Sequence, residues 1–519
     1  MSASFRRLAL FVLPAWFLGG CATTYLKLAP PSPSEPVIPA SAGGERAATQ
    51  ASSPIGPPPG DVADDGSVVQ PGRQYGLPEL VELAAASNPD TRIVWQRARQ
   101  AALAVGVVHA RDYPTLSALV LGGYQHSWFP VSSLNNGVNI VTQAFLPGIN
   151  LPGPPQGASG HIGLDTFEVV PFLALRWEAL DFSRGPAKRA AEQGSVAANL
   201  VFVGEHQKLL FQVSRTYFRL GAARAQVKVA QDALERTMTI DQSAEAKFGR
   251  GLATAVEVAE ARREVAQADY SLSEARAAEK VAQSALLTAL GVDPRMTLAI
   301  ETLSSGALAD SLRQPVDGYL QSALASRPDL GAAQAHASQA DAMIDHANST
   351  WLPKLSLVGT GGLQWLGAKT AGTSTNTATI PQVTALANLE WLLFDGGARE
   401  GSAEIARARR DEADLEIRKL RNVASQEVLS AYDEANAALS RYRAAQALER
   451  TAAVADDATA RSYSNGLSTL AEAASAQKAH SLASAAKEQA YAEARIATTL
   501  LTFAAGQLRG VGAIPDPVP

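Results

Sequence analysis

Side chains that could bind a metal or attack a substrate are sparse in this chain of 519 residues. It has one cysteine, Cys21, so a second thiolate ligand is absent. Its seven histidines show no mutual spacing typical of a metal site: His109, His126, His161, His206, His336, His346 and His480. The sequence also lacks a P-loop, a Gly-x-Ser-x-Gly motif and a dinucleotide-binding fingerprint. We therefore expect no enzymatic activity, no metal site and no cofactor.

The polar residues that do form a pattern lie in a short turn that occurs twice, at residues 248–257 and 463–472. Each copy has an aromatic residue, two spacers, Gly-Leu, a small residue, Thr, two spacers and Glu. Glycine after a long Ala- and Glu-rich stretch is typical of a helix C-cap, and the Thr three residues later is typical of the next N-cap. Each copy therefore predicts the tip of a helical hairpin.

The segments around the two tips also repeat. The same interval of 25 residues separates two prolines in each half of the chain: Pro89 and Pro114, then Pro328 and Pro353. We therefore predict a first repeat over residues 76–300 and a second over 301–510, each with a helix, a β-hairpin, a long helix and a return helix. Residues 511–519 are expected to form a flexible tail.

Each repeat contains two segments that are rich in β-branched, glycine and aromatic residues, and these predict strands. We place the four strands at about 115–128, 164–178, 354–365 and 381–393. Polar loops of unequal length are expected within the two hairpins of strands. Asp181 and Asp395 follow the return strands and are expected to cap the long helices.

The predicted helix lengths indicate how a repeat is arranged. The first long helix spans 65 residues from Ser183 to Lys247, which is about 100 Å at about 1.5 Å per residue. The two shorter helices of a repeat span 25 and 40 residues, which together match that length. We therefore expect them to stack end to end beside the long helix, in a rod with the strands at one end and the tips at the other.

The N-terminus has the features of an export signal. Two arginines precede an apolar run from Leu8 to Leu18, which is too short to span a bilayer. The run ends in Leu18-Gly-Gly-Cys21, which resembles the lipobox of bacterial lipoproteins, where the cysteine is lipidated and becomes the mature N-terminus. We expect a signal peptide over 1–20 and lipidation of Cys21; the alternative is a plain secretory signal with an incidental cysteine. Residues 21–75, rich in Pro, Ser and Gly, are expected to form an extended tether.

Four predicted strands constrain the oligomeric state. Four strands cannot close a barrel, and open sheet edges are not tolerated in lipid. An exported chain of this kind either keeps its strands out of the membrane or shares a barrel with other copies of itself. Three copies would supply twelve strands, a number that can enclose a water-filled lumen. The alternative is a periplasmic sheet without membrane contact.

Together these features resemble the TolC-like outer-membrane efflux family, and in particular its lipoprotein branch, the outer-membrane factors of tripartite (NodT/RND-type) efflux systems. The resemblance covers Cys21 and residues 76–508. It implies a mainly α-helical homotrimer with a twelve-stranded β-barrel in the bacterial outer membrane, continued by a long periplasmic α-helical barrel. It also implies a passive exit duct for small toxic compounds or drugs, which docks on a periplasmic adaptor (a membrane fusion protein) and an inner-membrane pump.

The resemblance also assigns roles to residues of the tips. It implies that the tips dock on the adaptor through eight residues: Phe248, Gly251, Leu252, Thr254, Tyr463, Gly466, Leu467 and Thr469. It places acidic residues at a lumenal constriction, for which the matching positions are Glu257, Glu260 and Glu472. The alternative for these glutamates is that they are ordinary solvated charges of a helix.

The competing function is a lipid-anchored periplasmic coiled-coil scaffold or adaptor without a membrane pore. An adaptor would have one long helical hairpin flanked by β domains, whereas this chain has two similar repeats. The net charge of −5 does not favour nucleic acid as a partner. The sequence leaves open which substrate, adaptor and pump are involved.

Overall fold

The computed structural model of the protein describes residues 22–35, 73–130, 161–301, 308, 309, 311–370, 375–508, 510 and 512. The expected signal peptide, Cys21 and most of the expected tether and tail lie outside the described residues. The chain forms two compact units. The helical unit comprises Met1–Leu103, Glu192–Ser338 and Arg410–Pro519, and the sheet unit comprises Ala104–Ala191 and Gln339–Arg409.

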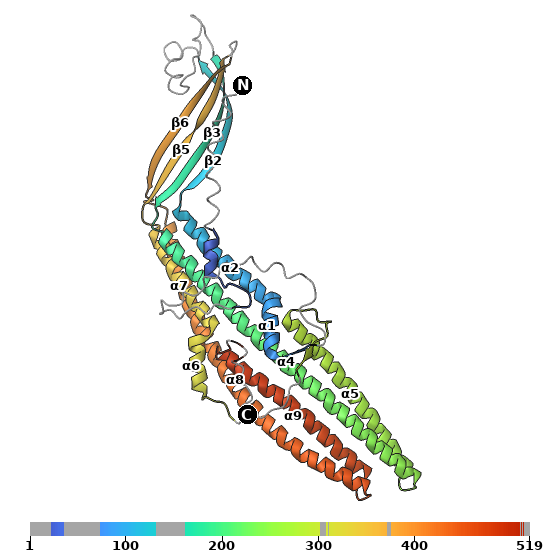
Figure 1. Cartoon of the computed structure of the whole chain (residues 1–519). Coiled ribbons are helices and arrows are strands. Elements are labelled where there is room, and N and C mark those ends of the chain that lie inside the picture. The colour runs from blue at the N-terminus through green and yellow to red at the C-terminus, as the bar shows by residue number, and fades with distance from the viewer. Residues whose placement is uncertain are drawn as a thin grey trace. The chain divides into compact units, whose positions relative to one another are not determined.

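Two long helical hairpins run largely within the helical unit (Figure 1). The first consists of α4 (Arg184–Gly249) and α5 (Ala255–Leu290), and the second of α8 (Ala398–Ser464) and α9 (Leu470–Ala504). Their sequences are rich in alanine, glutamate and arginine, which have high helix propensity. The two predicted tips are confirmed as the turns of these hairpins.

Four shorter helices precede the strands of the two repeats: α1 (Leu77–Ser87), α2 (Pro89–His109), α6 (Val316–Ser326) and α7 (Pro328–Ser349). Two 3₁₀ helices are η3 (Ala22–Leu28) and η4 (Ala110–Asp112). The start of α2 meets the end of α5, where Asn88 Nδ2 donates a hydrogen bond of 3.0 Å to the carbonyl of Ala289. In the second repeat Arg327 Nη1 donates at 3.3 Å to the carbonyl of Ala504. Helix α2 therefore meets the end of the return helix α5, and α7 meets the end of the return helix α9. This is the end-to-end arrangement that the helix lengths predicted.

Each repeat builds an apolar core where its short helices meet the long ones. In the first repeat, side chains of α1, α4 and α5, including the fully buried Phe218, pack with β1 (Gln74–Tyr75) and β4 (Ala299–Ile300), which pair in parallel. In the second repeat, alanines of α8 and α9 surround Tyr442 and Tyr491, whose ring centroids lie 5.5 Å apart. The small alanine side chains let the helices approach closely, so the aromatic rings fill the remaining space.

The N-terminal segment differs from the expectation of an extended tether, because residues 22–35 lie against the helical unit. The indole Nε1 of Trp95 in α2 donates a 2.9 Å hydrogen bond to the carbonyl of Pro30. The Nδ2 atom of Asn199 in α4 donates at 2.6 Å to the carbonyl of Leu28. Both acceptors are backbone carbonyls, which every residue has, proline included. The Pro-, Ser- and Gly-rich composition of the segment therefore gave no sign that it packs on the helices.

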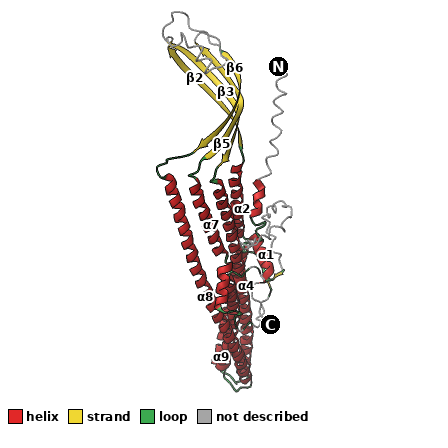
Figure 2. Cartoon of the chain, turned by 90° about the vertical axis from the view of Figure 1, so that its left-hand side faces the viewer, coloured by secondary structure: helices red, strands yellow, loops and turns green. Residues whose placement is uncertain are grey.

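The sheet unit contains one antiparallel sheet with the strand order β2-β3-β5-β6 (Figure 2). Its strands are β2 (Thr115–Pro130), β3 (His161–Leu180), β5 (Lys354–Thr370) and β6 (Asn376–Glu390). Because β3 pairs with β5, the strands of both repeats join in a single sheet. A register shift lies between Glu178 and Leu180 near the end of β3.

The strand boundaries correct the prediction. Strand β5 continues past the expected end at residue 365, and β6 starts at Asn376, so much of the expected loop between them is paired. Strand β6 ends at Glu390, so residues 391–393 lie outside it. Pairs such as Ala368 with Asn376 extend the ladder through polar and small residues, because backbone pairing does not depend on side-chain polarity.

Both aspartates expected at the starts of the long helices have a capping role. Asp181 Oδ1 accepts a 3.0 Å hydrogen bond from the amide of Ser183. Asp395 Oδ2 accepts at 3.1 Å from the amide of Arg399, in the first turn of α8. These carboxylates satisfy amides that have no partner within the helix.

Candidate functional site

The two tips have the same backbone geometry. Gly251 has a φ of 72° and Gly466 a φ of 75°, in the left-handed region that glycine adopts at little cost. The amide of Leu252 donates to the carbonyl of Lys247 at 2.9 Å, and the equivalent bond in the second tip measures 2.8 Å. Together with a bond from each glycine amide, this is the Schellman arrangement that ends a helix.

The threonines and glutamates of the tips form reciprocal caps. Thr254 Oγ1 accepts a 3.3 Å hydrogen bond from the amide of Glu257, and Glu257 Oε2 accepts at 2.7 Å from the amide of Thr254. Thr469 and Glu472 make the same two bonds at 3.2 Å and 3.0 Å. The predicted N-caps are therefore confirmed, and both glutamates help to hold the turn.

The three glutamates expected at a lumenal constriction differ in their surroundings. Hydrogen bonds from Ser468 and from Thr469 lower the pKa of the exposed Glu472 carboxyl. Glu257 is half-buried, and Glu260 is exposed without a hydrogen-bond or ion-pair partner among the described residues. Glu257 and Glu472 therefore cap a helix. The sequence pattern alone did not distinguish this capping role from a role at the lumenal constriction.

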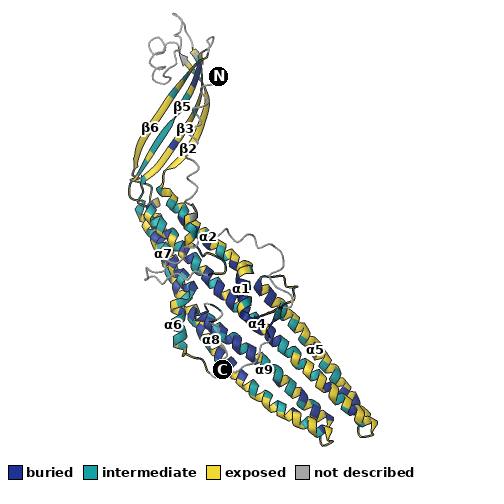
Figure 3. Cartoon of the chain, in the orientation of Figure 1, coloured by how far each residue is buried: buried dark blue, intermediate teal, exposed yellow. Residues whose placement is uncertain are grey.

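The hairpin tips contain exposed residues (Figure 3), and three of these residues are large and apolar. Leu252 is 72% exposed, Leu467 is 82% exposed and Phe248 is 49% exposed. Each leucine directly follows the left-handed glycine, so the Schellman turn holds it in a fixed place on the hairpin. Large apolar side chains held at the end of a rigid hairpin are suited to packing against another protein.

Tyr463, which the pattern places in the docking set, is instead buried between the hairpins at 7% exposure. It packs with four small or apolar residues: Ala244, Ala261, Leu470 and Ala473. The Nζ atom of Lys247, in the other hairpin, lies 3.6 Å from its ring centroid. The Tyr463 side chain therefore joins the two tips, and little of it is exposed for the docking role that the resemblance assigns to it.

Further polar contacts join the two hairpins farther from the tips. The buried Asp456 of α8 accepts a 2.7 Å hydrogen bond from Arg236 Nη1 of α4, and its Oδ2 lies 2.8 Å from His480 Nδ1 of α9. Gln477 Nε2 of α9 donates at 2.7 Å to Thr237 Oγ1 of α4. These contacts bind the two hairpins of one chain to each other.

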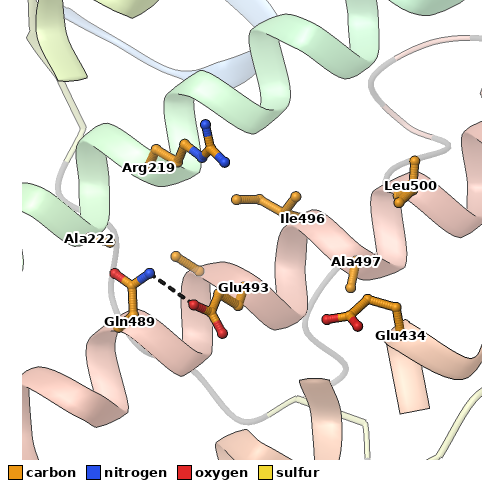
Figure 4. Close-up of a pocket in the computed structure, with 9 residues that line it drawn as sticks. Arg219, Ala222, Glu434, Gln489, Glu493, Ile496, Ala497 and Leu500 are labelled. Carbon is orange, nitrogen blue, oxygen red and sulfur yellow. Dashed lines mark hydrogen bonds between the residues drawn. The ribbon is translucent and has the colours of Figure 1, made fainter. Parts of the chain in front are cut away.

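A pocket of about 210 Å³ lies between α4, α8 and α9 (Figure 4). It is lined by Arg219, Ala222, Glu434, Gln489, Ala492, Glu493, Ile496, Ala497 and Leu500. Gln489 Nε2 donates a 2.9 Å hydrogen bond to Glu493 Oε1. The pocket is lined by one cationic side chain, two carboxylates and several apolar side chains, so it favours neither anionic nor cationic ligands. We therefore assign no binding role to it.

The described residues show no constellation for metal chemistry. No three His, Cys, Asp or Glu side chains among them gather as they would around a metal ion. The seven histidines lie on six different elements. Within the described ranges, no helix combines the length and the apolar character needed to cross a membrane.

The sheet has two chemically different faces. The register places Val120 beside Pro171 and Gly361 beside Val383 on one face, which we call the apolar face. Its large side chains, most of them exposed, are Leu116, Val120, Tyr124, Trp128, Phe167, Val169, Leu173, Leu175, Trp177, Leu357, Leu363, Trp365, Val383 and Leu389. An exposed apolar surface of this kind indicates contact with lipid or with another protein.

The alternate residues of the same strands form the second face, which carries most of the charged and amide side chains; we call it the polar face. It also carries apolar side chains such as Leu121, Phe172 and Leu386. On it, Gln382 Nε2 of β6 donates a 2.5 Å hydrogen bond to Gln364 Oε1 of β5. Gln364 Nε2 in turn donates at 3.1 Å to Glu168 Oε2 of β3. Alternation of apolar and polar residues with a period of two is typical of strands that have lipid on one face and water on the other.

The sheet ends in two unpaired strands. Strands β2 and β6 are its edges, and among the described residues no strand pairs with the outer side of either. Unpaired backbone groups at an edge are a template for pairing with another chain.

Comparison with known families decides the classification. The family model described as "Outer membrane efflux protein" matches residues 80–292 and 319–507, so it covers each repeat separately. The chain belongs to the outer membrane efflux protein family. The resemblance inferred from the repeats and tips is confirmed, and this outer membrane efflux protein is a protein of the bacterial outer membrane in a family of transport proteins rather than enzymes.

Individual relatives agree with this assignment. The outer membrane efflux protein is 27% identical over 395 residues to Protein CyaE of Bordetella pertussis, which covers 75% of this chain and 73% of that protein. It is 26% identical over 357 residues to the pyoverdine export outer membrane protein OpmQ of Pseudomonas aeruginosa, which covers 67% and 68%. Its fold is similar to that of the Campylobacter jejuni CmeC outer membrane channel, with a TM-score of 0.63 at 19% identity over 83% of this chain and 85% of that one.

Sequence reasoning missed the residues that link elements distant in the chain. Lys247 stands next to the aromatic residue of the first tip, but its contact with the second tip is not visible from that position. Glu168, Gln364 and Gln382 were also missed. The signal that could have identified Gln364 is its position between Leu363 and Trp365, since a polar residue between two large apolar ones marks the opposite face of a strand.

Proposed function

We propose that this outer membrane efflux protein is the exit duct of a tripartite efflux system and that three copies build it. The observation that carries the proposal is the single sheet with an apolar face, a polar face and two unpaired edges. Three copies would supply twelve strands and pair every edge, as backbone groups in lipid require. The apolar face would contact lipid, and the polar face would line a water-filled lumen.

In the same assembly the long helices would continue the duct through the periplasm as an α-helical barrel. Helix α8 carries exposed apolar side chains that neighbouring copies would cover, including Leu415 at 62%, Leu448 at 54% and Val454 at 72% exposure. Because the duct would be passive, the energy for export would come from the inner-membrane pump. Glu257, Glu260 and Glu472 would lie near the tips as candidates for a constriction of the resting duct.

The tips would dock on the periplasmic adaptor. Phe248, Leu252 and Leu467 would supply the exposed apolar contacts. Gly251 and Gly466 would let the backbone of the adaptor approach closely, and Thr254 and Thr469 would keep the turns rigid through their caps. Rigid tips lose little conformational freedom on binding, which favours affinity.

The N-terminus and the substrate complete the proposal. Cys21 would carry a lipid that anchors the mature chain to the outer membrane. The relative OpmQ is named for pyoverdine export, which supports a small organic molecule as the exported substrate. We favour toxic compounds or drugs as the substrate class.

The proposed duct is tested by reconstituting the purified mature protein in planar lipid bilayers. We expect stepwise ion conductance, and we expect a Cys21→Ser variant to stay in the membrane fraction because the strands hold it there. The competing function, a lipid-anchored periplasmic scaffold, makes the opposite prediction. Absence of conductance together with release of the Cys21→Ser variant into the soluble fraction would support the scaffold.

A further inference from the structure

The polar face of the sheet has an uneven distribution of charge. Its charged side chains among the described residues are Glu168, Arg176, Glu178, Lys354 and Glu390. Four of them lie together at one end of the strands, where Lys354 and Glu390 are direct cross-strand partners. These four comprise two cations and two carboxylates, so this end of the face is balanced.

Glu168 stands apart from the other four charges. It lies eight residues along β3 from Arg176, which corresponds to about 26 Å at about 3.3 Å per residue. Lys369 belongs to the apolar face, where its register partner is Asp165. Among the described residues, no cationic side chain on the polar face therefore lies near the Glu168 carboxylate.

Glu168 lies at the end of a chain of amide hydrogen bonds and beside the buried Leu366 of β5. The chain of hydrogen bonds from Gln382 to Gln364 to Glu168 points every amide donor toward the carboxylate. The carboxylate accepts the last hydrogen bond of this chain, which holds the Glu168 side chain on the polar face. On the other side, its register partner in β2 is Gly123, which has no side chain to cover it, and the Glu168 side chain is exposed.

We propose that Glu168 is a determinant of charge selectivity in the strand-lined part of the duct and that it favours cationic solutes. This inference rests on the proposed function, because it requires three copies that share one lumen. Three copies would place three such carboxylates at one level around the lumen. Rings of acidic side chains favour cations over anions in aqueous pores.

The size of the effect depends on salt. The screening length is about 10 Å at 0.1 M and about 3 Å at 1 M ionic strength. Charges on the wall of a water-filled lumen therefore act on passing ions at low salt and are screened at high salt. A selectivity that comes from Glu168 should be present at 0.1 M and nearly absent at 1 M.

The test is the reversal potential in planar bilayers under a potassium chloride gradient at low salt. We expect Glu168→Gln to lower the preference for potassium over chloride by about twofold, the size that Coulomb attraction in water at about 10 Å gives after screening. The matched control is Glu168→Asp, which keeps the negative charge at the same position of the same strand. We expect it to keep the cation preference.

A second variant distinguishes the loss of charge at residue 168 from a folding defect. Glu168→Cys should show the same loss of cation preference, and modification of the new thiol with a sulfonate-bearing methanethiosulfonate reagent should restore it. An unchanged ratio in Glu168→Gln, or the same loss in the charge-keeping Glu168→Asp, would overturn the inference while the duct itself stands. Absence of any conductance in the unmodified protein would instead overturn the proposed function, and the inference with it.

Discussion

The ammonium group of Lys247 lies 3.6 Å from the ring centroid of Tyr463 and donates a 2.5 Å hydrogen bond to the Tyr463 carbonyl oxygen. The two residues are 216 positions apart and belong to different hairpins. The contact makes the two tips of one chain a single unit. An adaptor would therefore meet both turns in a fixed relation rather than two independent hairpins.

Replacing Lys247 by Met should loosen the second tip, because it removes the charge and the donor but keeps an apolar side chain of similar length. A cation–π contact contributes about 0.5–2 kcal/mol and a hydrogen bond about 1 kcal/mol. We expect backbone amides of residues 463–470 to exchange hydrogen roughly tenfold faster, measured by mass spectrometry. Arg250→Met is the control, since within the described part of the chain the Arg250 side chain donates only to the carbonyl of Ala246, in the last turn of α4. Equal exchange in Lys247→Met and the unmodified protein would contradict the link.

The capping threonines should contribute to the stability of the hairpins. Loss of a threonine N-cap costs about 1 kcal/mol, so Thr254→Ala and Thr469→Ala should each weaken the first turn of α5 or α9. Thr254→Ser keeps the hydroxyl and should behave like the unmodified protein. The measurement is local hydrogen exchange over 255–260 and 470–475. If the alanine and serine variants exchange alike, the hydroxyl does not hold the turn.

The glutamates of the tips can be tested for charge separately from capping. Glutamine also serves as the third residue of a capping box, so Glu257→Gln and Glu472→Gln should leave the tips folded while removing their charge. We expect unchanged hydrogen exchange at the first tip, a modest increase at the second tip, where the charge of Glu472 contributes to stability, and, at low salt, a lower preference of the duct for cations. Glu257→Ala is the comparison in which both the cap and the charge are lost. A conductance identical to that of the unmodified protein would assign these glutamates to capping alone.

The second tip should also depend on pH. Hydrogen bonds from Ser468 and from Thr469 lower the pKa of Glu472, so its contribution to stability is present above the ordinary glutamate value and is lost as pH falls through the lowered value. We expect the tip to become more mobile as pH falls below about 4.3. A fluorescent probe attached to Asn465→Cys would report this as a drop in anisotropy. With Glu472→Gln added, the anisotropy should lose its dependence on pH in this range, and an unchanged curve would show that another group is responsible.

Arg327 should be the more important of the two residues that join short and long helices. Its side chain donates to Asp329 at 2.7 Å, to Glu427 at 2.5 Å and to the carbonyl of Ala504. Burial alone would raise the pKa of Asp329, but the hydrogen bond and the charge of Arg327, together with backbone hydrogen bonds, outweigh it and lower that pKa. We expect Arg327→Ala to cost about 2 kcal/mol, because it removes hydrogen bonds to two partly solvated carboxylates and to a backbone carbonyl.

Asn88 occupies the equivalent junction of the first repeat and provides the comparison for Arg327. Its amide is neutral, so Asn88→Ala should cost only about 1 kcal/mol. Urea unfolding monitored by circular dichroism would compare the two variants. Equal losses would contradict a special role for the charged junction.

Local chemistry made some features predictable from sequence. The left-handed glycines and the threonine caps depend on residues within ten positions of one another, so the pattern at 248–257 contained all the information needed. The same holds for Asp395, whose carboxylate caps amides two and four residues later. The alternation of side chains similarly indicated where strands lie.

Features set by contacts between distant segments could not be predicted. The burial of Tyr463 depends on Lys247, and the packing of residues 22–35 depends on Trp95 and Asn199. Strand ends were misplaced because ladder pairing continues through small and polar residues such as Ala368. In each case the residue that makes the contact lies far away in the sequence, so the local pattern does not predict the contact.

The oligomeric state is the most direct test of the proposed duct. The molar mass of the purified mature protein, corrected for bound detergent, can be measured by light scattering coupled to size-exclusion chromatography. The proposed duct predicts a mass of three chains, because only shared strands pair the edges of β2 and β6 in lipid. A clean monomer would contradict it, since the four strands of one chain would then leave both edges unpaired.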